Sequence, residues 1–217
     1  MNPTPELFPA DAPVERITPD GNAWCWVHVG ARRAVRLHTR TVIDLGITVG
    51  SSWTVELATR AHEASLVDHA VSGLRKWLHA RPRSSAEASD RIAKDDLDPQ
   101  LAQQAIDRLV ASGEINDAGV AELERHAAGR RGDSAERLTE RLKSRGLGDA
   151  IAHQSPDEPP SSSAIEIARR RAESFRPDLA WNIKARRLSG WLASRGFSED
   201  DSTHAVRTVL GEPPARD

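Results

Sequence analysis

Basic side chains recur at one predicted structural position along this 217-residue chain, and cations of this kind bind phosphate groups or acidic protein surfaces. Each group lies where the second helix of a predicted three-helix unit begins. The residues are Arg81 and Arg83, then Arg130 and Arg131, then Lys184, Arg186 and Arg187. A cation near a helix N-terminus is unfavourable because it opposes the helix dipole. Its repetition therefore indicates contact with an anionic partner.

A second set of cations follows one face of a predicted helix. Arg137, Arg141 and Arg145 are each four residues apart, so they share one side of the helix. Ordinary surface ion pairs with Glu136 and Glu140 explain this spacing equally well. The hypothesis of a DNA-binding or protein-binding surface gives the following candidate residues: Arg81, Arg83, Arg130, Arg131, Arg137, Arg141, Arg145, Lys184, Arg186, Arg187 and Arg195.

No constellation in the sequence favours an enzyme. Walker, GxGxxG and GxSxG motifs are missing, and the eight histidines do not pair at the i,i+4 spacing of a helical metal site. Adjacent acids such as Asp95-Asp96 and Asp200-Asp201 fall at helix boundaries, where capping explains them. We therefore expect no catalytic residues, no metal and no cofactor.

The elements that position the cations follow a repeat of 50 residues. An apolar residue closes a short turn at Leu97, Leu147 and Phe197. Buried-type residues precede it at fixed distances, five residues before at Ile92, Leu142 and Leu192, and nine before at Ala88, Leu138 and Leu188. A spacing of this kind is typical of repeat proteins, whose function is spread along a surface. It predicts a mainly α fold of tandem three-helix repeats in an elongated curved array.

Local signals place the ends of these helices. Ser84 with Glu87 forms a capping box, and Asp98 before Pro99 is a typical helix start. Gly146 and Gly196 suit the left-handed turn that ends a helix. The predicted organisation is a disordered Pro-rich tail (1–21), a small N-terminal β-hairpin module (22–60), three-helix repeat 1 (64–113), repeat 2 with a truncated third helix (116–153), a Pro/Ser linker (154–163), repeat 3 (164–211) and a terminal tail (212–217).

Composition narrows the class of protein further. The formal net charge of −2 argues against a globally basic nucleic-acid binder, yet the segment from Ile165 to Gly196 carries eight basic residues and three acids. Cys25 is the single cysteine, which excludes an internal disulfide, and we expect it to be an inert packing residue in a strand. The sequence shows neither a bilayer-length apolar run nor a signal-peptide core, so we expect a cytoplasmic protein.

The order and spacing of these motifs resemble the RecX family of regulatory proteins, over roughly Trp24 to Gly211. The motifs that carry the resemblance are Arg81-Pro82-Arg83-Ser84 with Glu87, Ala105-Ile106 with Leu109, Gly113 and Ile115-Asn116-Asp117, Gly132 with Leu138 and Leu142, Arg145-Gly146-Leu147, and Leu188 with Leu192, Arg195-Gly196-Phe197-Ser198, Val206 and Leu210. The hairpin module with Leu45-Gly46-Ile47 is similar to an extension found in many members.

This resemblance implies a modular helical protein that binds the RecA–single-stranded DNA filament along its groove. It implies inhibition of strand exchange, ATP turnover and co-protease activity, and hence a role in DNA recombination, DNA repair and the SOS response. We expect a monomer that contacts RecA and also single-stranded DNA, with the basic residues facing acidic protein surface or phosphate. Two alternatives stay open, a DNA-binding helical regulator that acts without RecA, and a generic helical protein-interaction scaffold.

Overall fold

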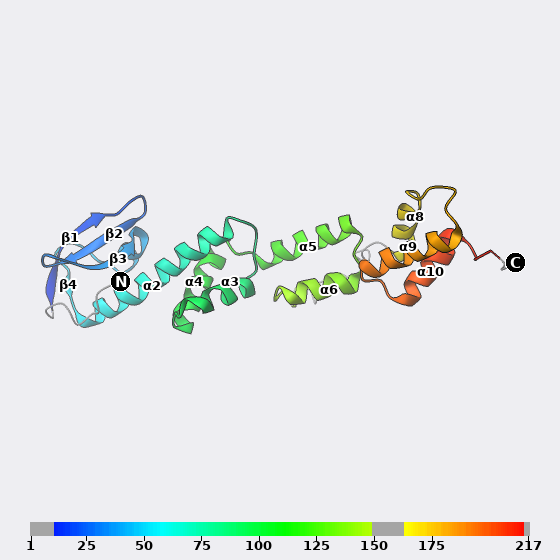
Figure 1. The fold of residues 1–217 in the computed structure, drawn as a ribbon. Helices are drawn as coiled ribbons and strands as arrows, with labels where there is room; N and C mark the ends of the chain where they lie inside the picture. Colours follow the sequence, from blue (N-terminus) through cyan, green and yellow to red (C-terminus); the bar gives the residue numbers. More distant parts are fainter. Residues whose placement is uncertain (1–10, 149–162, 215–217) are drawn as a thin grey trace. The chain divides into compact units, whose positions relative to one another are not determined.

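The computed structural model describes residues 11–148 and 163–214, and the chain divides after Ile115 into two compact units (Figure 1). Unit 1 holds a small antiparallel sheet and the helices of repeat 1. Unit 2 holds the described helices of repeats 2 and 3. The predicted mainly α fold with a small β-containing N-terminal module is therefore confirmed. The curvature of the whole array stays a prediction.

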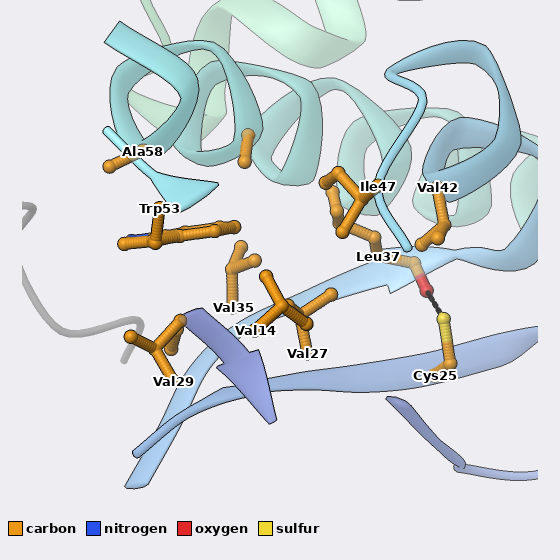
Figure 2. Close-up of a cluster of buried hydrophobic side chains, with 12 residues drawn as sticks. Val14, Cys25, Val27, Val29, Val35, Leu37, Val42, Ile47, Trp53 and Ala58 are labelled. Atoms are coloured by element: carbon orange, nitrogen blue, oxygen red, sulfur yellow. Dashed lines mark hydrogen bonds between the residues drawn. The ribbon is translucent and has the colours of Figure 1, made fainter. Parts of the chain in front are cut away.

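Unit 1 begins with four antiparallel strands in the order β3-β2-β1-β4. The strands are β1 (Ala12–Pro19), β2 (Trp24–Val29), β3 (Arg32–His38) and β4 (Ser52–Trp53). Figure 2 shows the buried face of the sheet, where Val27, Leu37 and Trp53 lie against the long helix that follows. Cys25 is buried in this core beside the Leu37 carbonyl, and burial raises the pKa of its thiol. The expectation of an inert packing cysteine agrees with this position.

The predicted disordered tail through residue 21 is wrong for residues 12–19, which form β1. Val14 is 1% exposed and fills the core of the sheet, so this short segment gains burial by pairing. Its prolines do not interrupt the ladder, because Pro13 pairs only with the two-residue strand β4 and Pro19 ends β1. Proline content alone therefore gave the wrong prediction here.

The predicted boundary between the hairpin module and repeat 1 falls inside one continuous helix. Helix α1 (Thr39–Asp44) is followed by α2 (Val55–Leu78), which starts at the N-cap Thr54 instead of near Ala64. Ala58 and Ala61 of α2 belong to the core under the sheet. Val67, Val71 and Leu74 of the same helix belong to the three-helix core of repeat 1. Because one helix serves both cores, the module and repeat 1 form a single unit.

A buried carboxylate joins the sheet to repeat 1. Asp68 on α2 accepts hydrogen bonds from the His38 backbone N–H and the Thr41 hydroxyl, both at 2.8 Å. Arg108 also donates to Asp68 at 2.8 Å, and the Asp68 side chain is only 4% exposed. An ion in this position needs such partners to offset the cost of desolvation.

Repeat 1 continues with α3 (Ser85–Ile92), a 3-10 helix η2 (Ala93–Asp95) and α4 (Pro99–Ala111). The Ser84–Glu87 capping box is confirmed in both directions, with the Glu87 N–H donating to the Ser84 hydroxyl at 3.1 Å and the Ser84 N–H donating to Glu87 at 3.0 Å. Asp98 caps α4 and Pro99 is its first residue, as predicted.

Unit 2 contains the helices expected for repeats 2 and 3. They are α5 (Asp117–Arg131), α6 (Ala135–Ser144), α8 (Ala164–Ala172), α9 (Trp181–Ser194) and α10 (Glu199–Leu210). The truncated third helix predicted from Asp149 lies outside the described residues, and so does the predicted linker apart from Ser163, which is the N-cap of α8. Residues 212–214 of the predicted terminal tail carry no helix.

The turn that recurs every 50 residues has the same backbone conformation in each repeat. Asp96, Gly146 and Gly196 have positive φ angles of 51°, 69° and 88°. The apolar residues that follow, Leu97, Leu147 and Phe197, pack on the cores of their own repeats. A left-handed residue at this position ends the second helix and turns the next side chain inward. The repeat inferred from spacing is therefore a repeat in structure.

Candidate nucleic-acid interface

The two predicted cations of unit 1 are held by intramolecular contacts. Arg81 donates to Glu87 at 2.6 Å, so it binds the same carboxylate that completes the α3 capping box. The guanidinium of Arg83 lies 3.9 Å from the ring centroid of Trp77, and its side chain is only 18% exposed. These contacts stabilise the turn between α2 and α3. They also explain why a helix start here tolerates cations, since the neighbouring Glu87 offsets their charge.

In unit 2, three of the predicted arginines converge on one buried acid. Asp133 lies in the turn between α5 and α6, and its side chain is 3% exposed. Arg131 donates to it at 2.8 Å, while guanidinium nitrogens of Arg141 and Arg195 lie at 3.8 and 3.5 Å. Because Arg195 follows α9, this cluster ties repeat 3 to repeat 2.

A second acid binds arginines that lie on the same face of α6. Glu124 on α5 accepts a hydrogen bond from Arg145 at 2.7 Å, and Arg131 and Arg141 lie 3.9 Å from it. The Arg145 side chain is 15% exposed. Arg141 and Arg145 are therefore ion-paired, but their partners are Glu124 and Asp133 instead of the expected Glu136 and Glu140.

The backbone at this junction leaves no room for larger residues. The Ser134 N–H donates to the Arg195 carbonyl at 2.9 Å, and the Ser134 hydroxyl donates to the Gly196 carbonyl at 2.8 Å. A Cβ on Gly196 would lie 2.7 Å from Cβ of Arg137, and one on Gly132 would lie 2.9 Å from Cδ1 of Ile167. Arg137 therefore contributes its aliphatic stem to the junction.

The remaining predicted cations are more accessible. Arg130, Arg186 and Arg187 are exposed, and within residues 11–148 and 163–214 none of them has a carboxylate within 4.0 Å. Lys184 is half-buried and donates to the Pro177 carbonyl at 2.9 Å. These side chains keep their charge available for a partner.

A pocket of about 210 Å³ opens between α5, α8 and α9. Its lining combines four guanidinium side chains with one indole, and the residues are Arg130, Arg131, Gly132, Ile167, Arg170, Arg171, Ser174 and Trp191. Of the four arginines, Arg131 is held by Asp133 and Arg170 pairs with Glu166 at 3.2 Å. The lining of the pocket is therefore both cationic and aromatic.

Trp191 is the centre of this arrangement. The guanidinium of Arg195 lies 5.2 Å from its ring centroid, and that of Arg171 lies 5.8 Å away. Arg187 precedes Trp191 by four residues on α9 and so lies on the same side of the helix. Cations around an indole bind phosphates while the ring stacks on a base, which is how single strands are commonly bound.

Sequence reasoning missed Arg170, Arg171 and Trp191. One signal was available, because Arg187, Trp191 and Arg195 are each four residues apart and place an aromatic ring between two cations. The proximity of α8 to the end of α5 had no such signal, since it depends on how the helices pack. Among the described residues, no group of three or more acids, histidines or cysteines could hold a metal ion. The described helices also include none that is long and apolar enough to cross a membrane.

Comparisons with known proteins agree on one relationship. No family model matches the chain. A protein of Streptomyces lividans named regulatory protein RecX is 28% identical over 153 residues, which cover 67% of this chain and 80% of that protein. A protein of the same name from Thermobifida fusca is 29% identical over 143 residues, covering 62% and 75%. One from Lacticaseibacillus casei is 24% identical over 179 residues, covering 80% and 67%.

Solved structures show the same fold. A crystal structure of regulatory protein RecX superimposes with a TM-score of 0.63 at 14% identity, over 92% of this chain and 98% of that one. RecX from Lactobacillus salivarius superimposes with a TM-score of 0.51 at 16% identity, over 67% and 97%. These likenesses define the fold as that of a helical-repeat protein. In sequence and in fold, the chain is similar to RecX regulatory proteins.

Proposed function

We propose that this chain is a non-enzymatic regulator that binds the RecA–single-stranded DNA filament and reduces its recombinase, ATPase and co-protease activities. The observation that carries the proposal is the likeness to RecX proteins in sequence and in fold over most of the chain. The proposal places the protein in the cytoplasm, acting as a monomer.

The contacts inside unit 2 divide the predicted cations into two groups. Arg131, Arg141, Arg145 and Arg195 serve as framework residues, because each is bound to Asp133 or Glu124 and would have to leave that partner to reach another anion. Arg81 and Arg83 have the same role at the start of α3.

The second group forms the proposed contact surface. Arg130 and Arg187 are exposed and, within the described ranges, without an ion pair, so they lose no internal partner on binding. Arg171 and Trp191 extend this surface into the pocket. The proposed contact residues are therefore Arg130, Arg171, Arg186, Arg187 and Trp191.

The test is RecA's ATP hydrolysis on single-stranded DNA with the purified full-length chain. Wild-type protein should inhibit at substoichiometric amounts. The double variant Arg130→Gln with Arg187→Gln should need roughly tenfold more protein for the same inhibition, since two exposed charge contacts are lost. Lys143→Gln removes an exposed charge from α6 of the same unit and should inhibit like wild type. Equal inhibition by all three proteins would show that this surface is not the contact surface.

One observation favours the second candidate function, direct DNA binding without RecA. The pocket pairs Trp191 with several guanidinium groups, which suits a single strand by itself. A DNA-binding regulator should shift labelled DNA with no RecA present, and its affinity should fall steeply with salt. Inhibition of RecA in the absence of such a shift would favour the filament-binding function.

A further inference from the structure

The sheet of unit 1 has a second face that its core does not use. Figure 2 shows Cys25, Val27 and Val29 of β2 on the buried face. Successive residues of a strand point to opposite faces, so Trp24 and Trp26 lie on the other side. We call this side the outer sheet face, and define it by Arg16 and Thr18 of β1, Trp24, Trp26 and His28 of β2, and Arg33 and Arg36 of β3.

Cross-strand pairing places cations beside both indoles of the outer sheet face. Trp26 pairs with Arg36 across β2 and β3, and His28 pairs with Arg33. The Arg33 guanidinium lies 5.0 Å from the Trp26 ring centroid, and that of Arg36 lies 4.5 Å from the Trp24 ring. Two indoles and their guanidinium neighbours therefore alternate along the face.

Among the described residues, these tryptophans lie outside the hydrophobic cores of unit 1. Trp53 is 3% exposed in the core, whereas Trp24 and Trp26 are half-buried and belong to no core cluster among the described residues. Trp24 also contacts His69 of α2, at 4.8 Å between ring centroids. Large aromatic rings placed away from a core commonly serve binding.

The charge of the outer sheet face is positive at its centre. Arg16 and Arg33 flank His28, and within residues 11–148 and 163–214 neither arginine has an ion pair. Burial, followed by the charges of Arg16 and Arg33, lowers the pKa of His28. Arg36 differs, since Asp20 binds its Nε at 2.5 Å.

His28 itself carries an unused polar atom. Its Nε2 lies 2.9 Å from the Thr18 hydroxyl, and the residue is 4% exposed. In the described part of the chain, its buried Nδ1 has no hydrogen-bond partner. Buried polar atoms are rarely left without a partner, so this nitrogen is an exception within the described residues.

We propose that the outer sheet face is a binding site for single-stranded nucleic acid. Bases stack on Trp26 and Trp24, and phosphates bind Arg16 and Arg33. A sheet that presents aromatic rings to bases, with basic residues for the backbone, is an arrangement suited to single strands because every base offers a planar face. A duplex keeps its bases stacked inside and offers only phosphates to this face. An acidic peptide would bind the arginines without stacking on the indoles.

This site lies in unit 1, whereas the contact residues of the proposed function all belong to unit 2, so the inference goes beyond the proposed function. A photo-crosslinking experiment on the full chain locates it directly. The probe is a single-stranded oligonucleotide carrying 5-iodouracil, which crosslinks to aromatic side chains stacked on it. Trypsin releases Trp24 and Trp26 together in the peptide Ile17–Arg32. We expect the crosslinked nucleotide on this peptide, and less of it after the oligonucleotide is annealed to its complement.

Matched variants distinguish the contribution of base stacking to binding from the contribution of positive charge. Trp26→Thr keeps a strand-forming residue and should reduce crosslinking and single-strand affinity about fivefold or more, whereas Trp26→Phe should retain most of both. Arg33→Gln should weaken binding and make the dependence on salt less steep. Arg40→Gln removes an exposed charge from α1 in the same unit, outside the outer sheet face, and should bind like wild type.

Two results would overturn the inference. One is crosslinking confined to peptides of unit 2, with none on Ile17–Arg32. The other is unchanged single-strand binding by Trp26→Thr and Arg33→Gln when circular dichroism shows both variants folded. Binding of an acidic peptide that survives Trp26→Thr, with no crosslink to the oligonucleotide, would assign the face to a protein partner instead.

Discussion

The junction between repeats 2 and 3 gives a sharp prediction, because Gly113 and Gly196 both follow a helix with a positive φ angle but have different surroundings. Their φ angles are 74° and 88°. A Cβ on Gly113 would meet nothing within 4 Å, whereas one on Gly196 would lie 2.7 Å from Cβ of Arg137 and 2.9 Å from the Ser134 hydroxyl. Alanine at Gly113 therefore tests the backbone conformation alone. Alanine at Gly196 tests the backbone conformation and the junction together.

The expected magnitudes follow from these contacts. A left-handed alanine costs about 1–2 kcal/mol at either position. At Gly196 the overlap adds about 1–3 kcal/mol, because relieving it moves α6 away from the turn. That movement also weakens the hydrogen bonds from Ser134 to Arg195 and Gly196, each contributing about 0.5–1.5 kcal/mol. We expect Gly196→Ala to destabilise unit 2 by about 2–5 kcal/mol, and Gly113→Ala to destabilise unit 1 by about 1–2 kcal/mol.

Hydrogen exchange measured by mass spectrometry is the appropriate assay, since it reports opening segment by segment. Gly196→Ala should lower protection in α6 and α9 far more than Gly113→Ala lowers it in α4. Gly190→Ala is the control, because a Cβ there meets open space inside α9 and alanine favours a helix. It should leave protection unchanged or raise it. Equal losses from Gly113→Ala and Gly196→Ala would refute the close packing of the two repeats.

Three further predictions concern the buried acids and pH. Asp133→Asn should destabilise unit 2 by about 1–3 kcal/mol in urea denaturation, because three arginines lose their shared counter-charge. Asp68→Asn should destabilise unit 1 by about 2–4 kcal/mol in the same measurement, because Arg108 loses its partner and two donors lose a carboxylate. The hydrogen bond from Arg75 lowers the pKa of Glu114, so the unfolded state binds more protons once the pH falls below about 4.3. The urea midpoint of unit 1 should therefore fall with decreasing pH in that range, and Arg75→Gln should make this fall shallower.

The helical repeats were predictable because their signals are local. Apolar residues three and four apart predict a helix face, and caps such as Ser84 or Asp98 fix its start by hydrogen bonds within the same turn. Gly146 and Gly196 marked the turns because few other residues adopt a positive φ at low cost.

The roles of individual arginines were not predictable in this way. Asp133 and Arg195 are 62 residues apart, and their approach depends on how repeat 3 packs on repeat 2. The sequence offered Glu136 and Glu140 as nearby partners, but the buried partners are Asp133 and Glu124. Burial strengthens an ion pair relative to one in water, so position in the fold decides which acid pairs.

Strand β1 was missed for a related reason. A strand gains its hydrogen bonds from a neighbour, and the neighbour of Ala12–Pro19 on one side is the two-residue strand β4, 40 residues further along the chain. Prolines at positions 13 and 19 resemble those of a disordered segment until the pairing is known.

Co-sedimentation with RecA filaments assembled on single-stranded DNA examines the proposed function without relying on inhibition. The labelled full-length chain should sediment with the filaments in a saturable manner and should require both RecA and DNA. The variant Arg130→Gln with Arg187→Gln should sediment less. A chain that stays in the supernatant with intact filaments, or that sediments equally well with DNA lacking RecA, would contradict filament binding.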